Sequence, residues 1–398
     1  MKNRIMIVGG GTGGTIVANL LARKLRREIA SGQVELMLIS ESPVHYYKPA
    51  FMYVAFNLFH HHELARPERQ LLSPEIRFIT DKIEAFDFKQ RRLYGASKQH
   101  YDWDLLVIAT GCTPFPQKIP GLAEAGDHFY QYAAARQLAH KLSTIKKGRI
   151  FITVSFPETP NVPHQCGIAP IETTLMVDDY LRQRGVRNQV EIVYTYPTVA
   201  QLLRNCLFLQ RPVGEALGDI FAAKGIQHQR GFTLSHVDPD SKIAYSAEGD
   251  SQNFDILMAT PPIRAVEAVR NTGLSEVQNG EGWLPTDHQT LGVYGLEGVY
   301  VIGDTVDLPI SKAGGSCHNQ APIIADNIVA ELYGRPPGSG NHYDGRVQAV
   351  AQMGLWAGMP LVYDYRNDVT PMPATKLGGM LRNGFNRGLY WGVVRGMF

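Results

Sequence analysis

The sequence predicts an α/β fold with two Rossmann-like domains, followed by an amphipathic C-terminal region. A glycine-rich motif follows an apolar run of strand length near the N-terminus, and further apolar runs alternate with helix-like segments. The length of 398 residues also exceeds what one hydrophobic core usually organises. We place the first domain at residues 1–111 and 285–345, the second at residues 112–284, and the C-terminal region at residues 346–398.

The composition excludes several classes of protein. Hydrophobic residues make up 44% and charged residues 19% of the chain, as in ordinary folded proteins. The net charge of +2 argues against a nucleic-acid partner. We see no run of about 18 apolar residues, so no membrane-spanning helix is expected. Because the first strand begins close to residue 4, a signal peptide has no room, and we expect a cytoplasmic protein with reduced thiols.

The first motif joins a strand to a helix. Apolar residues Ile5 to Val8 predict a buried strand, and Thr15 to Leu25 predict a helix. Between them, Gly9, Gly11 and Gly14 fit G-x-G-x-x-G. The first glycine allows a tight turn, the second lets backbone approach a pyrophosphate, and the third lets the helix pack closely on the strand. We therefore predict a dinucleotide site here; a purely structural glycine-rich turn is the alternative.

The second strand is predicted at Val34 to Ile39. In a dinucleotide fold, an acid at the end of this strand accepts the ribose hydroxyls. Glu41 is our candidate, although it stands further from Gly14 than the usual spacing of roughly 20 residues. A solvated surface glutamate is the alternative.

An aromatic segment at residues 43–59 has no clear strand or helix pattern, so we expect a loop that lines an apolar pocket. Three histidines follow at residues 60–62. Consecutive side chains diverge, and no cysteine stands at ligand spacing, so we predict no metal site.

Two later strands complete a flavin signature. Leu105 to Ile108 form a buried run that ends in Ala-Thr-Gly, which makes Thr110 and Gly111 candidate cofactor contacts. Such a strand leads out of the FAD domain in flavoproteins with two dinucleotide domains, so FAD is favoured over NAD. The strand that begins at Val299 ends in Gly303 and Asp304, whose carboxylate can accept hydrogen bonds from a ribityl chain.

A helix is expected to begin within residues 307–320 and to aim its N-terminus at the flavin ring. That positive helix end stabilises an anionic reduced flavin. Lys312 would add a fixed charge; the alternative is a surface lysine.

The second domain opens with a strand at Arg149 to Val154, where a nicotinamide-binding domain would carry another glycine motif. Residues 155–172 instead hold three prolines before Cys166 and no G-x-G-x-x-G. We therefore expect that this domain does not bind a nicotinamide nucleotide. A helix is predicted at Thr173 to Arg184, a strand at Val190 to Tyr194, and a return strand in residues 254–262.

The tail at residues 376–398 carries apolar side chains every four residues, namely Leu377, Leu381, Phe385, Leu389 and Val393. It also carries four basic residues and no acid, which predicts an interfacial helix with Tyr390 and Trp391 at the level of lipid headgroups. We therefore expect peripheral attachment to the cell membrane, on its cytoplasmic side. The alternative is a helix docked on the protein's own core or on a second subunit.

With these motifs, the chain resembles the sulfide:quinone oxidoreductases, two-dinucleotide-domain flavoproteins related to flavocytochrome c sulfide dehydrogenase and the type II NADH dehydrogenases. The resemblance covers nearly the whole chain and includes residues 45–49 (His-Tyr-Tyr-Lys-Pro) and 311–314 (Ser-Lys-Ala-Gly). Its most specific element is Cys-Gly-x-Ala-Pro-x-Glu, which runs from Cys166 to Glu172.

The resemblance implies that sulfide is oxidised through a redox-active cysteine, that FAD receives two electrons, and that a quinone takes them up on the other face. Cys166 matches the cysteine beside the flavin, and Glu172 matches an acid that could move protons if burial raised its pKa. A buried structural cysteine is the alternative for Cys166.

The second redox cysteine is missing from the expected positions. Ala349 stands where the family pattern Tyr-Asp-Gly-x-x-x-Cys has its thiol, and Leu284 follows Gly-Trp, where the flavocytochrome relatives place theirs. Our hypothesis is that Cys166 pairs with Cys317, with Cys206 as a weaker candidate. Two other functions stay open: another flavin-dependent quinone reductase of the type II NADH dehydrogenase kind, and an FAD-binding electron-transfer subunit. A homo-oligomer is also possible.

Overall fold

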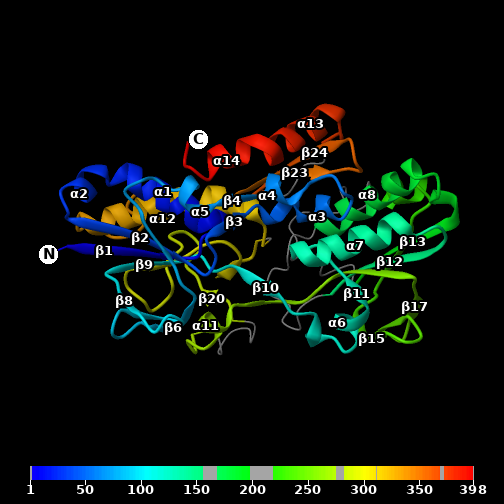
Figure 1. Ribbon diagram of the computed structural model, residues 1–398, viewed down its shortest axis with the longest axis horizontal. Helices are drawn as coiled ribbons and strands as arrows, with labels where there is room; N and C mark the ends of the chain where they lie inside the picture. The colour runs from blue at the N-terminus through cyan, green and yellow to red at the C-terminus, as the bar shows by residue number, and fades with distance from the viewer. Residues whose placement is uncertain are drawn as a thin grey trace.

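The computed structural model describes residues 2–155, 168–197, 218–274, 282–310, 312–367 and 372–397. Two five-stranded parallel sheets lie side by side, with helices packed on them, and the C-terminal region lies across one face of the molecule (Figure 1). The predicted α/β fold with two parallel sheets is therefore confirmed. No helix among the described residues is long and apolar enough to cross a membrane.

The first sheet has the strand order β21-β9-β1-β2-β5. Its strands are β1 (Asn3–Val8), β2 (Val34–Ser40), β5 (Arg77–Thr80), β9 (Leu105–Ile108) and β21 (Val299–Val301). The central strand is buried on both faces, because helices cover it, among them α1 (Thr12–Lys24) and α12 (Gly314–Leu332). Since parallel strands end at one edge, the predicted cofactor residues that follow β1, β2, β9 and β21 gather there.

The second sheet has the order β11-β18-β12-β13-β14. Its strands are β11 (Gly126–Asp127), β12 (Gly148–Val154), β13 (Val190–Tyr196), β14 (Gln227–Arg230) and β18 (Ile256–Thr260), and its main helices are α7 (Tyr132–Thr144) and α8 (Ala169–Gln183). The strands predicted at 149–154, 190–194 and within 254–262 are confirmed. Helix α8 begins four residues before the predicted start, since Pro170 is tolerated in its first turn.

Short antiparallel elements surround the two sheets. They are β6 (Ile83–Asp87), β7 (Arg92–Gly95) and β8 (His100–Asp102); β15 (Leu234–Asp238), β16 (Ile243–Ser246) and β17 (Ser251–Asn253); and the pair β10 (Cys112–Pro114) and β19 (Ile263–Ala265). Strands β20 (Leu284–Pro285) and β22 (Val306–Asp307) form a parallel pair. The short helices are α2 (Arg26–Ala30), α5 (Glu68–Leu71), α6 (Leu122–Ala125), α11 (Glu267–Arg270), η2 (Pro116–Lys118), η3 (Arg187–Gln189) and η4 (Gly303–Thr305).

The aromatic segment at residues 43–59 is not the loop that we predicted. It forms β3 (Val44–Tyr46), paired with β4 (Ala65–Pro67), and then the helical turns η1 (Lys48–Ala50) and α3 (Phe51–Val54). Phe51, Tyr53 and Phe56 are buried, so their aromatic rings belong to the hydrophobic core. Tertiary packing thus gives this segment a structure that its sequence pattern does not indicate.

The C-terminal region consists of the hairpin β23 (Val347–Gln352) and β24 (Gly358–Tyr363), then α13 (Lys376–Gly384), the π-helical turn η5 (Phe385–Leu389) and α14 (Tyr390–Val393) (Figure 1, orange to red). Tyr390 and Trp391 are 0% and 9% exposed. Their predicted position at the headgroup level is therefore wrong, because the second half of the tail docks on the protein's own core. Other apolar side chains of the tail are exposed, namely Leu377, Met380, Leu381 and Leu389.

Candidate functional site

The three motif glycines meet different surroundings, as the sequence predicted. Gly9 has φ +115°, and a Cβ built on it would lie 2.3 Å from the carbonyl oxygen of Ala109. A Cβ on Gly14 would lie 2.0 Å from the carbonyl oxygen of Gly9. A Cβ on Gly11 would meet no described atom within 4 Å. Two glycines are therefore required by packing, and the third leaves space beside the start of α1.

The N-terminus of α1 has no side-chain cap from the described residues. Its first N–H groups are therefore available to an anion, and the helix dipole favours negative charge at this position. The end of β2 adjoins the same loop, because a Cβ on Gly10 would lie 2.9 Å from the Ser40 hydroxyl oxygen. Glu41, the predicted ribose ligand, follows Ser40 and is exposed.

The ends of β9 and β21 are joined by hydrogen bonds. The Thr305 hydroxyl donates to the carbonyl oxygen of Gly111 at 3.1 Å and lies 3.3 Å from the Thr110 hydroxyl. Gly111 and Gly303 both adopt the left-handed region, with φ of +68° and +75°. The predicted cofactor residues Thr110, Gly111, Gly303 and Asp304 thus lie together at one edge of the first sheet.

Lys312 is 5% exposed, so the alternative of a surface lysine is wrong. Its Nζ donates to the carbonyl oxygens of Asp304 and Val306 at 2.7 and 2.6 Å. It also lies 3.8 Å from the centroid of the Trp283 ring. Burial lowers the pKa of Lys312 to about 8, although the nearby Asp304 raises it. Lys312 therefore provides a fixed, desolvated cation beside Asp304.

Cys112 is a residue that the sequence analysis did not select for the site. Its thiol donates to Asp304 Oδ2 at 3.4 Å. Burial, together with the Asp304 carboxylate, raises the pKa of this thiol well above its usual value. The available signal was its position directly after Ala-Thr-Gly, which brings it to the cofactor edge.

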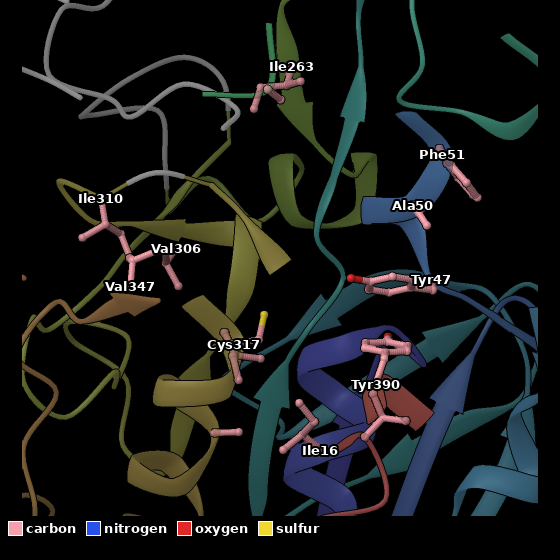
Figure 2. Close-up of a cluster of buried hydrophobic side chains, with 14 of the residues drawn as sticks. Ile16, Tyr47, Ala50, Phe51, Ile263, Val306, Ile310, Cys317, Val347 and Tyr390 are labelled. Atoms are coloured by element: carbon pink, nitrogen blue, oxygen red, sulfur yellow. The ribbon is translucent and has the colours of Figure 1, made fainter. Parts of the chain in front are cut away.

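Cys317 packs between the glycine loop and the end of β21. Its Sγ lies 3.3 Å from a Cβ built on Gly13 and 3.2 Å from one built on Gly303. Figure 2 shows Cys317 on α12 within a buried cluster that also contains Tyr390. Burial raises the pKa of the thiol, so this sulfur is held protonated. Cys166 and Cys206 lie outside the described residues, and the pairing of Cys166 with Cys317 stays a prediction.

Glu172 lies in the first turn of α8 and is 2% exposed. Its Oε1 accepts a hydrogen bond from the backbone N–H of Gln352 at 2.5 Å, and Arg382 of the tail approaches to 3.5 Å. Burial raises the pKa of Glu172, and Arg382 and Gln352 oppose this shift. Gln352 ends the same strand, β23, that carries Ala349 at the missing thiol position.

The histidines at residues 60–62 are exposed, and His60 caps the turn α4 (His61–Leu64) together with Glu63. In the part of the chain that the structure describes, no group of three or more His, Cys, Asp or Glu side chains is arranged to hold a metal ion.

Part of the chain that forms the cofactor edge matches a known protein family. Residues 3–153 match the model of the pyridine nucleotide-disulphide oxidoreductases, which spans the glycine loop, β9 and β12. The N-terminal part of the chain therefore resembles the pyridine nucleotide-disulphide oxidoreductases. The chain is a flavin oxidoreductase of the group that includes sulfide:quinone oxidoreductases and type II NADH dehydrogenases.

Three relatives illustrate this resemblance. A mitochondrial sulfide:quinone oxidoreductase of Dictyostelium discoideum is 25% identical over 356 residues, which cover 87% of this chain and 74% of the relative. An NADH dehydrogenase-like protein of Mycobacterium tuberculosis is 25% identical over 351 residues, covering 84% of this chain and 82% of the relative. The crystal structure of the Aquifex aeolicus sulfide:quinone oxidoreductase has a TM-score of 0.82 at 19% identity, covering 99% of this chain and 92% of that one.

Members of this family bind a flavin dinucleotide, and the residues of this chain fit such a group. Gly11 leaves open space at an uncapped helix N-terminus, where a pyrophosphate binds in dinucleotide folds. The backbone of Gly111 is equally open, since a Cβ on it would meet no described atom within 4 Å. Asp304 and Lys312 then provide an acceptor and a cation at the neighbouring strand end.

Proposed function

We propose that this protein is an FAD-dependent oxidoreductase that oxidises sulfide, or a related reduced sulfur species, and passes two electrons to a membrane quinone. The observation that carries the proposal is the buried Glu172, six residues after Cys166, in contact with Arg382 of a tail whose outer face is apolar. The names of the Dictyostelium and Aquifex relatives support the same substrates.

The net reaction is HS⁻ + quinone + H⁺ → S⁰ + quinol, so one proton must be delivered on the quinone side. Bound FAD would supply the two-electron carrier between the sulfur compound and the quinone. Cys317 is the proposed disulfide partner of Cys166: HS⁻ would attack this disulfide, so that the sulfur of Cys317 becomes a persulfide and Cys166 is released as a thiolate, which would pass two electrons to bound FAD. Counting free thiols in oxidised and reduced protein tests that pairing, and an unchanged count rejects it.

Glu172 would hold the proton for the quinone. A carboxyl group whose pKa is raised by burial keeps its proton closer to neutral pH and can act as a general acid. Lys312 and the N-terminus of α12, which no side chain of the described residues caps, would stabilise negative charge that develops at the edge of the first sheet. In this proposal, negative charge is stabilised at Lys312 and α12, and the proton is delivered at a separate place, by Glu172.

The tail would rest on a membrane surface. Its exposed apolar side chains occupy one face of α13, next to the exposed Trp356, and the exposed basic residues Lys376 and Arg395 suit anionic lipid headgroups. We propose peripheral attachment on the cytoplasmic side of the cell membrane. A helix lying in the interface needs only one apolar face, which is what α13 offers.

An anaerobic titration of the purified protein tests the proposal. We expect sulfide to bleach the flavin absorbance, a soluble quinone to restore it, and NADH to have no effect. Bleaching by NADH but not by sulfide would instead establish a type II NADH dehydrogenase, which the mycobacterial relative favours. Bound FAD with no response to either donor would indicate an electron-transfer subunit.

A further inference from the structure

A buried chain of polar side chains joins the tail to the glycine loop. The Tyr390 hydroxyl lies 2.8 Å from the Thr12 hydroxyl and 2.6 Å from His45 Nε2. On the other side of the imidazole ring, Nδ1 lies 3.0 Å from Glu68 Oε2. His45, Glu68 and Tyr390 are each 0% exposed. The chain therefore runs from a buried carboxylate, through a histidine and a tyrosine, to the first residue of α1.

The orientation of the chain follows from its donors and acceptors. A carboxylate can only accept, so Glu68 takes hydrogen bonds from His45 Nδ1 and, at 2.7 Å, from the Thr15 hydroxyl. In the neutral imidazole, Nε2 is then the acceptor and receives the Tyr390 hydroxyl. The tyrosine oxygen is left to accept from Thr12, which fixes the side chain of Thr12.

Glu68 also lies directly against the loop, because a Cβ on Gly10 would be 3.2 Å from its Oε2. Buried polar groups of this kind are costly unless every member is paired. An apolar cluster would hold the tail equally well, so the network provides a specific geometry rather than adhesion alone. That geometry is centred on residues 10–15, the turn that binds phosphates in this family.

Other contacts attach the same end of the tail to the same helix. Asn19 Nδ2 donates to the carbonyl oxygen of Val394 at 2.9 Å, and Arg23 donates to that of Gly396. The Tyr390 ring also faces the ring of Tyr47, the residue before η1 (Figure 2), and the two ring centroids lie 3.9 Å apart. Helix α1 is thus held by the tail along its length, from Thr12 to Arg23.

We propose that Tyr390 is a positioning residue of the dinucleotide site: through Thr12 it holds the first turn of α1 in its binding geometry, which couples docking of the tail to FAD binding. The inference rests on the proposal that this fold holds FAD. Coupling between two binding events is reciprocal, so FAD must also tighten the docked tail by the same factor.

Tyr390→Phe tests the coupling, because it keeps the ring and removes only the hydroxyl. We expect the dissociation constant of FAD, measured on apoprotein by quenching of FAD fluorescence, to rise about five- to tenfold. Tyr47→Phe is the matched control. It removes another buried hydroxyl that bonds to the tail, at 2.7 Å from Asn386 Oδ1, without reaching Thr12. Its FAD dissociation constant should stay within about twofold of wild type.

Two further measurements separate positioning from general stability. The double variant Thr12→Val with Tyr390→Phe should bind FAD no more weakly than Thr12→Val alone, because both changes remove the same contact. Thr12→Ser keeps the hydroxyl and should bind FAD with wild-type affinity. In the wild type, FAD should slow hydrogen exchange of the amides at 390–397, and in Tyr390→Phe this protection should shrink by the same factor as the affinity.

The outcomes are distinguishable from those that test the proposed function. Equal FAD affinity in Tyr390→Phe and wild type, or tail exchange indifferent to FAD, would overturn the coupling and leave the FAD enzyme intact. Equal losses in both tyrosine variants would overturn the positioning role of Tyr390 through Thr12. A wild-type protein that binds no FAD would overturn both.

Discussion

At the scale of single residues, Lys312 is the most informative side chain, because the structure shows it as a buried cation and excludes the alternative of a surface lysine. Its pKa is lowered to about 8, whereas the unfolded chain has the ordinary lysine value of 10.5. Between these two pH values the unfolded state binds more protons than the folded state, so this residue makes stability rise with pH. The contribution can reach about 3 kcal/mol at full deprotonation.

Lys312→Met should therefore remove this pH-dependent contribution to the free energy of unfolding. We expect the wild type to gain unfolding free energy relative to the variant steadily from pH 7 to pH 10, measured by urea unfolding of apoprotein. Comparing the two proteins cancels the opposite contributions of the buried tyrosines, which are common to both. Lys98→Met, at an exposed lysine, is the control and should give a difference that does not change with pH. A constant difference for Lys312→Met would contradict a depressed pKa.

Residue-level prediction from the sequence worked where local chemistry decides the role. Gly9 and Gly14 are required by contacts between a strand and the helix that follows it, and such contacts are encoded within a few positions. Cys112 was missed, because its neighbour Asp304 is distant in the sequence and only the closing of the sheet brings them to 3.4 Å. The partner of Lys312, the Trp283 ring, was hidden for the same reason.

At the scale of elements, the strand–turn–helix unit gives a matched pair of variants. Gly14→Ala would place a Cβ 2.0 Å from the carbonyl oxygen of Gly9, so α1 must shift away from β1. We expect the apoprotein to lose about 1–3 kcal/mol of unfolding free energy. Gly11→Ala meets no described atom within 4 Å and keeps φ at −96°, so its apoprotein should change by less than about 1 kcal/mol.

FAD binding should separate the two variants in another way, because Gly11→Ala should lose FAD affinity while it keeps its stability. Gly11→Ala fills space that the dinucleotide needs, and its FAD affinity should fall at least about tenfold although the fold is intact. Urea unfolding and FAD titration on the same preparations check both statements. Loss of stability without loss of FAD affinity in Gly11→Ala would mean that the dinucleotide does not approach this turn.

The tail shows why an element can be predicted while its orientation is not. The four-residue period of apolar side chains correctly indicated a helix from Lys376 onward. The π-helical turn at Phe385–Leu389 adds one residue, and one residue rotates the following side chains by about 100°. Tyr390 and Trp391, which follow this turn, are buried in the protein.

The exposed half of the tail makes a separate prediction about lipid binding. Leu377 and Leu381 are 65% and 61% exposed, and each would contribute about 1.5–3 kcal/mol on entering an apolar phase. The double variant Leu377→Asp with Leu381→Asp should reduce co-sedimentation with anionic vesicles at least about tenfold, without changing FAD content. Tyr294→Asp, at an exposed aromatic residue outside the tail, is the control. Equal vesicle binding by all three proteins would reject the tail as the lipid-binding surface.

At the scale of the whole molecule, the two parallel sheets were predictable because the strands of each sheet are apolar runs in the sequence, separated by helical segments. The contacts that join the parts were not, since they pair residues from opposite ends of the chain. Glu172 with Gln352, and His45 with Tyr390, are 180 and 345 positions apart. Each involves the C-terminal region, which lies across both domains (Figure 1) and whose docking only the folded structure reveals.

Docking of the tail also affects the pKa of a buried acid in the second domain, Glu172. Arg382 lies 3.5 Å from Glu172 and lowers its pKa, in opposition to burial. Arg382→Gln removes this opposition, so the pKa of Glu172 should rise further and its carboxyl group should keep its proton to higher pH. If Glu172 is the proton donor, quinol formation slows as pH rises through its pKa, and this alkaline limb should move to higher pH in the variant, while flavin reduction by sulfide keeps its profile. Stopped-flow traces of the two half-reactions across pH 5 to 9 measure both.

Arg387→Gln is the matched control, because Arg387 belongs to the same tail but pairs with Glu63 and not with Glu172. A shift of equal size in both variants would mean that tail docking in general, and not the charge of Arg382, sets the proton affinity of the buried acid.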